Sequence, residues 1–216
     1  MTVQAEIDAI ISKDELQALL SNREIVIDPI LDPAKQIQSV SVDLRLDNYF
    51  GEFVSTKEAI IDPSDLRASY LDFAELEFYK EHYVIQPGDF VLGQTFEYIA
   101  LPGNIVGLLE GRSSIGRQGL MVHVTAGVVD PGFSGHLVFE LANVGKMPLL
   151  VYPLMRVARM TFVRTKRTSL YSGQYSMQIR IRIPSVDEDF KKIKRENQTE
   201  KKNKERNQSA SYPTPC

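Results

Sequence analysis

The segment V-D-P-G-F-S-G-H-L-V-F-E-L, residues 129–141, gives the clearest indication of the fold. It opens with an Asp130-Pro131-Gly132 turn, where glycine tolerates the backbone angles that tight turns need. Apolar and polar residues then alternate, which predicts a strand over 136–141. This alternation places Leu137, Phe139 and Leu141 on one face, and His136, Val138 and Glu140 on the other. On this evidence Glu140 is either a solvated strand residue or a catalytic carboxylate.

Short runs of the same kind continue on both sides of this segment. Strands are predicted at 39–46, where polar and apolar residues alternate, and at 83–85, 90–92, 98–101, 105–109, 149–152 and 157–163. Such strands, separated by turn signals, indicate an all-β sandwich or barrel. A loop-rich excursion with short strands is expected over 57–82. A short N-terminal helix is expected where Ser12 and Glu15 show capping-box spacing and leucines recur at helical intervals.

The composition excludes several classes of protein. The chain has 216 residues, 43% of them hydrophobic and 25% charged, which fits one globular domain with or without a tail. It has no run of 18 apolar residues and no secretory signal pattern, so we expect neither a membrane span nor secretion. Its only cysteine is Cys216, which excludes an internal disulfide framework and a cysteine-based zinc site in the core. The expected location is cytoplasmic.

The charge is distributed unevenly along the chain. Residues 185–216 hold 8 Lys and Arg against 6 Asp and Glu, whereas the rest holds 17 against 22. An acidic body does not suit duplex binding, so no nucleic-acid partner is expected. The only apolar residues of 191–216 are Ile193, Ala210, Tyr212 and Cys216. We therefore expect a β domain over 1–184 and a tail over 185–216 that is disordered or a frayed helix, with a functional basic tail as the alternative.

The densest polar segment is E-G-R-S-S-I-G-R-Q-G, residues 110–119. Its glycines let backbone amides approach an anion, and its arginines supply planar donors for phosphate oxygens. The order of residues is not that of a Walker loop. The segment suits a polyphosphate cradle or, alternatively, a plain polar turn. Asp130 likewise has two interpretations, a turn residue or an acceptor for a sugar hydroxyl. His123 and His136 could pair at a metal ion, but no cysteine or carboxylate cluster supports such a site, so we expect no metal bound by protein side chains.

Two runs resemble the central motifs of the dCTP deaminases, which belong to the trimeric dUTPase superfamily. They are G-R-S-S-I-G-R-Q-G-L-M-V-H-V-T-A-G at 111–127 and the segment at 129–141, supported by runs at 41–46, 86–89 and 156–162. The resemblance covers roughly residues 10–180. It implies a mostly-β fold, a distorted jelly roll or β-barrel of the dUTPase-like type with a short N-terminal helix. It also implies a homotrimer with active sites between subunits.

The resemblance implies a role for each residue of the site. The catalytic residue is Glu140, with Ser113 and Arg117 positioning a water, and Asp130 binds the deoxyribose 3′-hydroxyl. A C-terminal lid is implied over 168–180. The nucleotide-binding residues implied are Arg112, Ser113, Ser114, Ile115, Gly116, Arg117, Thr125, Ala126, Asp130, Val138, Phe139, Glu140, Arg159, Tyr171, Gln174 and Gln178.

The chain departs from the family pattern at three places. Gln174 stands where the lid normally has a lysine, and Arg159 stands where bifunctional deaminases and dUTPases have a glutamine. Arg159 could supply the charge that Gln174 lacks. Gly127-Val128 replaces the His-Arg pair of the single-function bacterial deaminases, and looks more like the deaminases that also hydrolyse dUTP.

The expected reaction is hydrolytic deamination of dCTP to dUTP and ammonia, a step toward dTTP. The H-x-E…P-C-x-x-C signature of zinc deaminases is absent, so the expected route uses no zinc. Glu140 would act as general base on water and then as general acid on the amine. Mg²⁺ would travel with the triphosphate. Besides dCTP, dUTP or dTTP are candidate ligands.

Three alternatives remain open. The first is a bifunctional enzyme that converts dCTP to dUMP. The second is a dUTPase, in which Asp130 helps water attack the α-phosphorus; here Glu140 is the discriminator, because trimeric dUTPases usually have a small or apolar residue at that place. The third is a nucleotide-binding trimer without activity.

Overall fold

The computed structural model describes residues 9–53, 73–76, 81–125, 127–166, 170–173 and 175–181, and the single residues Lys192, Arg195, Glu196, Thr199 and Lys202. The chain divides into two compact units, Met1–Phe53 with Ala74–Arg182, and Val54–Phe73 with Ile183–Cys216. Nearly all described residues belong to the first unit. Most of the expected excursion over 57–82 and most of the expected tail over 185–216 lie outside the described residues.

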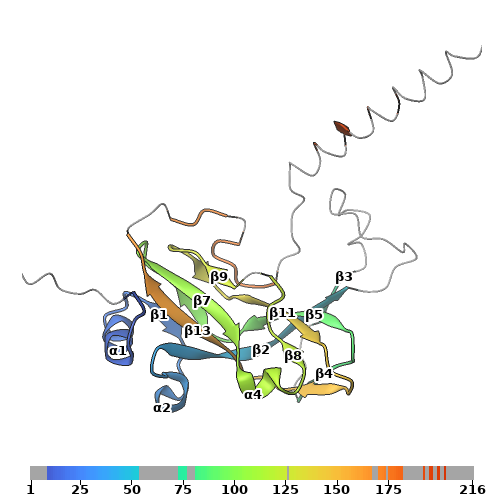
Figure 1. Cartoon of the computed structure of the whole chain (residues 1–216), viewed down its shortest axis with the longest axis horizontal. Helices are drawn as coiled ribbons and strands as arrows, with labels where there is room; N and C mark the ends of the chain where they lie inside the picture. The colour runs from blue at the N-terminus through green and yellow to red at the C-terminus, as the bar shows by residue number, and fades with distance from the viewer. Residues whose placement is uncertain are drawn as a thin grey trace, which may run out of the picture. The chain divides into compact units, whose positions relative to one another are not determined.

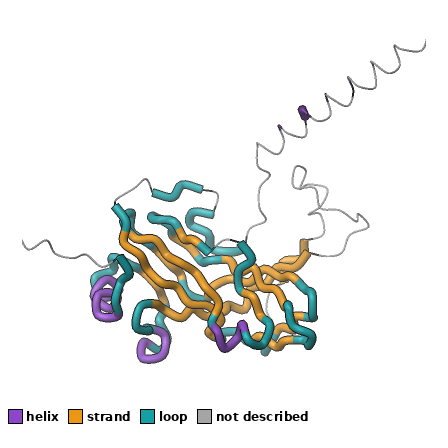
Figure 2. The backbone as a smooth tube through the Cα atoms, in the orientation of Figure 1, coloured by secondary structure: helices purple, strands orange, loops and turns teal. Residues whose placement is uncertain are grey.

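The first unit is built mainly from short strands (Figures 1 and 2). Its helices are α1 (Lys13–Ser21), α2 (Pro33–Gln36) and α4 (Ser113–Gly116). The strands before α4 are β1 (Val26–Asp28), β2 (Ser41–Phe53), β3 (Phe73–Leu76), β4 (Tyr83–Ile85), β5 (Phe90–Thr95), β6 (Tyr98–Ala100) and β7 (Ile105–Gly111). Those after it are β8 (Leu120–Met121), β9 (Val128–Val129), β10 (Ser134–Gly135), β11 (Val138–Asn143), β12 (Leu149–Val151) and β13 (Arg156–Arg164). The expected mostly-β class is confirmed.

The strands form three sheets. The largest has the order β8-β11-β5-β2-β13-β7-β9, with β3 also paired to β2, and the two others are β1-β6-β10 and β12-β4. The long strand β2 lies between β13 and β5. Its first residues pair with β13 and its later ones with β5, and its register with β5 shifts between Leu46 and Phe50. Strand β2 thus links two parts of the sheet.

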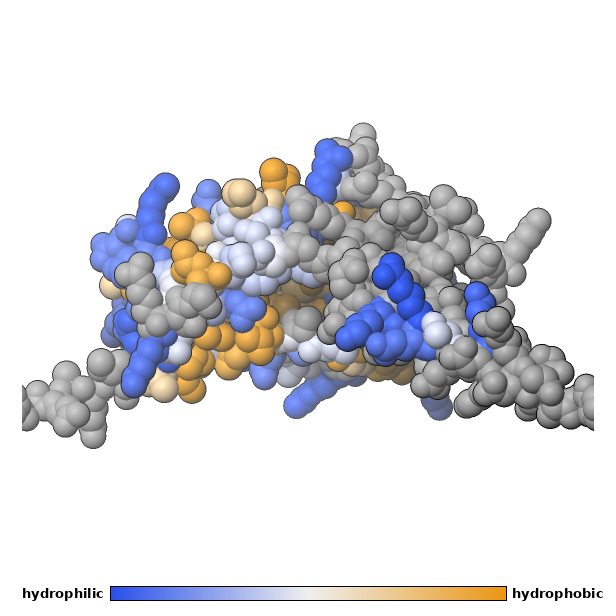
Figure 3. Space-filling model, turned by 90° about the horizontal axis from the view of Figure 1, so that it is seen from above, coloured by the Kyte–Doolittle hydropathy of each residue, from blue (hydrophilic) through white to orange (hydrophobic). Residues whose placement is uncertain are grey.

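The core lies under the faces that the alternation predicted to be apolar. Leu137, Phe139 and Leu141 are buried in β11 and its approach, and Leu44 and Leu46 are buried in β2. Burial of each such side chain contributes about 1.5–3 kcal/mol to folding. Some apolar side chains remain on the surface, as the orange atoms in Figure 3 show. The exposed apolar residues include Leu108, Val128 and Leu170. None of the helices in the described part is long and apolar enough to cross a membrane.

The structure corrects two details of the sequence analysis. Helix α1 forms after Ser12 as predicted, but the Ser12 side chain makes no capping hydrogen bond. Glu15 instead pairs with Arg164 of β13, so the predicted capping box is replaced by a tertiary ion pair. In β2, alternation predicted a polar face, yet Ser41 and Asp43 are only 2% and 1% exposed. The reason is that other elements cover this face of β2.

Candidate functional site

Glu140 is fixed to the loop that precedes β9. It lies half-buried on β11, and its Oε2 accepts hydrogen bonds from the backbone N–H groups of Val124 and Thr125 at 2.8 and 3.0 Å. Its own N–H donates to the Val122 carbonyl at 3.1 Å. No described residue donates to Oε1. The carboxylate is therefore oriented by one oxygen, and the other can take part in proton transfer.

The loop after β7 folds into a single helical turn, α4, rather than an open cradle. Arg112 is its N-cap, and the Arg112 N–H donates to Val157 of β13 at 3.0 Å. Ile115 is buried and anchors the turn in the core. Ser113, Ser114, Gly116 and Arg117 are exposed. The turn thus presents its hydroxyls and one guanidinium outward, where a ligand or a neighbouring subunit can reach them.

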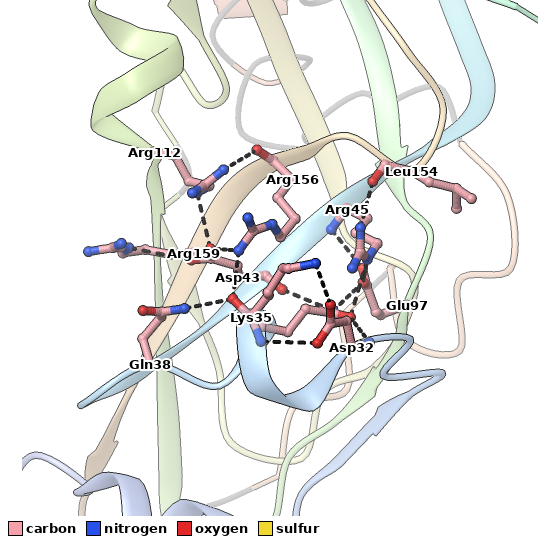
Figure 4. Close-up of polar contacts among 11 residues, drawn as sticks. Asp32, Lys35, Gln38, Asp43, Arg45, Glu97, Arg112, Leu154, Arg156 and Arg159 are labelled. Atoms are coloured by element: carbon pink, nitrogen blue, oxygen red, sulfur yellow. Dashed lines mark hydrogen bonds and ion pairs between the residues drawn. The ribbon is translucent and has the colours of Figure 1, made fainter.

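Arg112 turns toward a buried carboxylate in β2 (Figure 4). Its Nε lies 3.1 Å from Asp43 Oδ2, and Nη1 of Arg156 donates to the same oxygen at 3.1 Å. Nε of Arg159 lies 3.8 Å from Asp43 Oδ1. Arg159 also faces Glu110 across the β13–β7 pair. The structure thus brings two of the predicted phosphate-binding arginines, Arg112 and Arg159, to one acidic residue.

The predicted lid runs along the turn that carries Asp130. The Tyr171 N–H donates to the Pro131 carbonyl, the Met177 N–H to Ser134, and the His136 N–H to the Gln178 carbonyl, each at 2.8 Å. Tyr171 also packs against Phe133, with 6.1 Å between ring centroids. Gln178 is 2% exposed, and its Nε2 has no hydrogen-bond partner. The lid side chains are therefore placed beside the Asp130 turn.

Two glycines allow this close approach of the lid. At Gly135, which has φ 144°, a Cβ would lie 2.7 Å from the Gln178 carbonyl oxygen. At Gly132, which has φ 83°, a Cβ would lie 2.9 Å from the Leu170 Cβ. Gly132 also makes the predicted turn, since the Phe133 N–H donates to the Asp130 carbonyl at 3.1 Å.

The remaining predicted residues fall into distinct environments. Asp130 and Thr125 are exposed, and Val138 is half-buried on the same face of β11 as Glu140. The side chains of Ile115 and Phe139 lie in the core, so any ligand contact at these positions would come from the backbone. Ala126 and Gln174 lie outside the described residues. Among the described residues, no three His, Cys, Asp or Glu side chains are grouped so as to hold a metal ion.

Sequence reasoning missed three parts of this arrangement. The amides of Val124 and Thr125 carry no side-chain signal, and Asp43 and Arg156 looked like ordinary strand residues. A further buried carboxylate, Glu97, accepts hydrogen bonds from the Gln36 amide and the Arg45 N–H, both at 2.9 Å. Removal from water raises the pKa of Glu97 to about 7, and the Arg45 N–H bond opposes this rise.

Comparison with known proteins identifies the fold and the family. The structure aligns with the 2′-deoxycytidine 5′-triphosphate deaminase of Agrobacterium tumefaciens at a TM-score of 0.56 and 19% identity, over 71% of this chain and 46% of that one. The fold is therefore of the dUTPase-like type. A family model described as dCTP deaminase-like matches residues 10–165. The chain belongs to the dCTP deaminase-like family.

Curated relatives agree with this assignment. The dCTP deaminase, dUMP-forming, of Methanothermobacter thermautotrophicus is 45% identical over 156 residues, which cover 71% of this chain and 78% of the relative. The protein of the same name from Methanosphaera stadtmanae is 40% identical over 195 residues, covering 84% of this chain and 96% of the relative.

Proposed function

We propose that this protein converts dCTP to dUMP by deaminating the base and then hydrolysing the triphosphate. The deamination step is supported by Glu140, a carboxylate oriented by two amides with one oxygen available. The sequence alone favoured dUTP as the final product. The relatives described above are named dUMP-forming, and this favours the bifunctional alternative instead.

In the first reaction Glu140 handles the proton. Oε1 of Glu140 accepts a proton from a water molecule as the water oxygen bonds to C4 of cytosine. The protonated carboxyl then donates that proton to N4, and the C4–N4 bond breaks to release ammonia. Exposed Ser113 and Arg117, contributed by a neighbouring subunit, position the water. The base becomes uracil without any change in oxidation state.

In the second reaction water attacks the α-phosphorus, and pyrophosphate leaves. Asp130, exposed at the turn beside the lid, binds the 3′-hydroxyl or helps to activate that water. The exposed hydroxyls of Ser113 and Ser114 and the nearby arginines bind the phosphates. Mg²⁺ enters with the triphosphate, whose oxygens supply most of its ligands.

Gly127 is a local feature that supports the bifunctional assignment. A Cβ at this position would lie 3.2 Å from the Leu109 carbonyl oxygen and 3.4 Å from Cε1 of His123. The Leu109 N–H also donates to the Gly127 carbonyl at 2.7 Å. A residue with a side chain here would crowd the Leu109 carbonyl, which would have to shift slightly, so glycine suits this position in the loop that holds Glu140.

We further propose that the chain assembles as a homotrimer. Cross-strand pairs Arg159–Glu110, Thr161–Leu108 and Val163–Val106 define an outer face on β13 and β7. Val128 of β9 pairs with Leu108 on this face, and the two are 62% and 38% exposed. An apolar patch of this kind suits a subunit interface.

The test is a product analysis. Purified protein is incubated with dCTP and Mg²⁺, and the products are separated by anion-exchange chromatography. We expect ammonia, pyrophosphate and dUMP in equal amounts. Accumulation of dUTP would restrict the activity to deamination, and absence of ammonia would overturn the proposal. Incubation with dUTP alone separates the second reaction from the first.

A further inference from the structure

Asp43 is a buried carboxylate to which the proposed reactions assign no role. It is 1% exposed, and three arginines from two regions of the chain surround it. Arg112 comes from the start of α4, whereas Arg156 and Arg159 come from β13 (Figure 4). A carboxylate at this depth is costly unless it is paired, so the arginines explain its burial.

The cluster of Asp43, Arg112, Arg156 and Arg159 has more positive than negative charge. One carboxylate neutralises one of three guanidiniums, which leaves a formal excess of two positive charges. The arginine side chains are 23%, 24% and 42% exposed, in chain order. Each guanidinium has five N–H donors, and only some of them are used within the chain. The cluster therefore has both charge and donors available for an anion.

Backbone carbonyls hold two of the three arginines, Arg112 and Arg156, in place. Arg112 Nη1 donates to the Arg156 carbonyl at 3.0 Å, and Arg156 Nη1 donates to the Lys35 carbonyl. Asp43 itself is held through its carbonyl, which accepts from Nε2 of Gln36 at 3.2 Å. Ser113 follows Arg112 directly, so the cluster adjoins the exposed hydroxyls of α4.

We infer that Asp43 is a positioning residue, which holds Arg112 and Arg159 together beside α4 so that they bind the triphosphate of the substrate. This inference rests on the proposed function for the identity of the anion. Without a shared carboxylate, the like charges of the guanidiniums would repel one another, and only the carbonyl hydrogen bonds of Arg112 and Arg156 would oppose their separation. The negative charge of Asp43 thus weakens the electrostatic attraction of the cluster for the anion, but it holds the arginine donors in the arrangement that binding requires.

The variant Asp43→Asn separates the effect of net charge on anion binding from the effect of arginine placement, because the two predict opposite changes in affinity. If charge alone governs binding, removal of a carboxylate near an anion site must tighten binding. If Asp43 positions the arginines, binding must weaken although the cluster has become more positive. If an arginine no longer reached the anion, loss of its one charge-assisted hydrogen bond to a phosphate oxygen would weaken binding by roughly tenfold or more.

The experiment measures binding of inorganic tripolyphosphate by calorimetry to the full chain and three variants: Asp43→Asn, Arg156→Gln and the double variant. The double variant keeps the formal charge of the wild-type cluster. We expect Asp43→Asn to bind roughly tenfold more weakly than wild type, and the double variant to bind more weakly than Arg156→Gln alone. Binding of deoxycytidine, which carries no phosphate, should change less than about twofold in all variants.

Each other outcome is decisive. Equal or tighter binding of tripolyphosphate by Asp43→Asn would overturn the inference, as would a wild-type protein that does not bind this anion. Thermal unfolding identifies a variant that does not fold. If Asp43→Asn alone fails, the charge-balanced double variant decides; if both fail, Asp43 serves the fold and its assignment as a positioning residue is wrong. Absence of dCTP turnover would count against the proposed function only, because the binding series does not depend on catalysis.

Discussion

The carboxylates of Glu140 and Asp43 differ in how many of their oxygens neighbouring groups contact. Glu140 is oriented by two backbone N–H groups that contact only Oε2. Asp43 is enclosed by guanidiniums that approach both of its oxygens. A group that must gain and lose a proton needs an accessible oxygen, whereas a group that organises cations is best enclosed by them. In the proposed function and the further inference, the same functional group would therefore serve chemistry on β11 and positioning on β2.

Replacement of Glu140 by glutamine tests the first of these roles. Glutamine keeps the size of the side chain, and its carbonyl oxygen can accept both loop N–H bonds, so the loop should stay in place. Proton transfer is lost, and we expect deamination of dCTP to slow by about 10²–10⁴-fold. Steady-state ammonia release measures this. Unchanged thermal stability is the control, and turnover near the wild-type rate would contradict the assignment.

The raised pKa of Glu97 implies that the free energy of unfolding of this protein depends on pH. Its pKa is raised from 4.5 to about 7 in the folded chain, so the folded state keeps a proton that the unfolded chain has already released. Stability from this group is therefore complete below about pH 4.5 and is lost as the pH rises through 7. The expected loss is roughly 3 kcal/mol. Urea unfolding at pH 5, 6, 7 and 8, at one protein concentration, measures it.

The matched variant for this experiment is Glu97→Gln. It removes the titrating group from the buried site, so its free energy of unfolding should vary less with pH over the same range. Parallel pH profiles for wild type and variant would mean that Glu97 stays ionised in the folded chain. The hydrogen bonds from Gln36 and Arg45 would then outweigh the cost of burial.

At the residue scale, alternation predicted some burial correctly and failed elsewhere for a physical reason. In 137–141 it identified the buried side chains, because the other face of β11 is only partly covered. In β2 it placed Asp43 on the polar face, yet Asp43 is 1% exposed. An alternating pattern shows which residues of a strand share a face, but it does not show which other elements cover that face. The cover here comes from α2, α4 and β13, and such long-range contacts leave no local signal.

Among the elements, the lid and the turn after Asp130 depend on each other. Three backbone hydrogen bonds join the segments 131–136 and 171–178, and the bridge between Gly135 and Gln178 is parallel. That 168–180 acts as a lid stays a prediction, but the packing explains why glycine occupies 132 and 135. The segment predicted as a phosphate cradle differs more from expectation, because residues 113–116 form the helical turn α4.

Gly135→Ala should release the lid. The alanine Cβ would meet the backbone of Gln178 at 2.7 and 2.8 Å, and φ is 144°, where residues with a side chain are strained. We expect faster chymotrypsin cleavage after Tyr171 or Tyr175 and a raised KM for dCTP. Gln178→Ala is the control, because it removes the side chain but keeps the backbone bridge. It should leave cleavage unchanged, and equal protection of both variants would contradict this account.

For the whole molecule, the mostly-β class could be predicted because turn signals and short alternating runs are local properties. The final product, dUTP or dUMP, is not a local property of this kind, so the sequence left both open, and dUMP is proposed from the dUMP-forming relatives. Assembly is also a property of a surface. Val128 and Leu108 are adjacent only because β9 pairs with β7.

Val128→Asp tests the proposed trimer. A carboxylate buried in an apolar interface without a partner costs several kcal/mol, so we expect dissociation to monomers and loss of dCTP turnover. Sedimentation velocity measures the assembly. Met147→Asp is the control, because Met147 is 75% exposed in the loop before β12 and lies outside the proposed interface. A Val128→Asp protein that stays trimeric and active would place the interface elsewhere.

Truncation separates the parts of the chain that fold, assemble and react. β13 ends at Arg164 and closes the main sheet, and the lid follows it with Tyr171 and Gln178 beside the Asp130 turn. A chain that stops after Arg167 keeps every strand of the sheets, so it should assemble as the full chain does but lose most dCTP turnover. A chain that stops after Ser185 keeps the lid and should assemble and turn over dCTP at near the full rate. Circular dichroism, sedimentation and ammonia release distinguish these outcomes. If the longer chain, ending at Ser185, became an inactive monomer, residues 186–216 would be part of the structural unit, and the polar composition of that segment would then reflect contacts made only in the assembly.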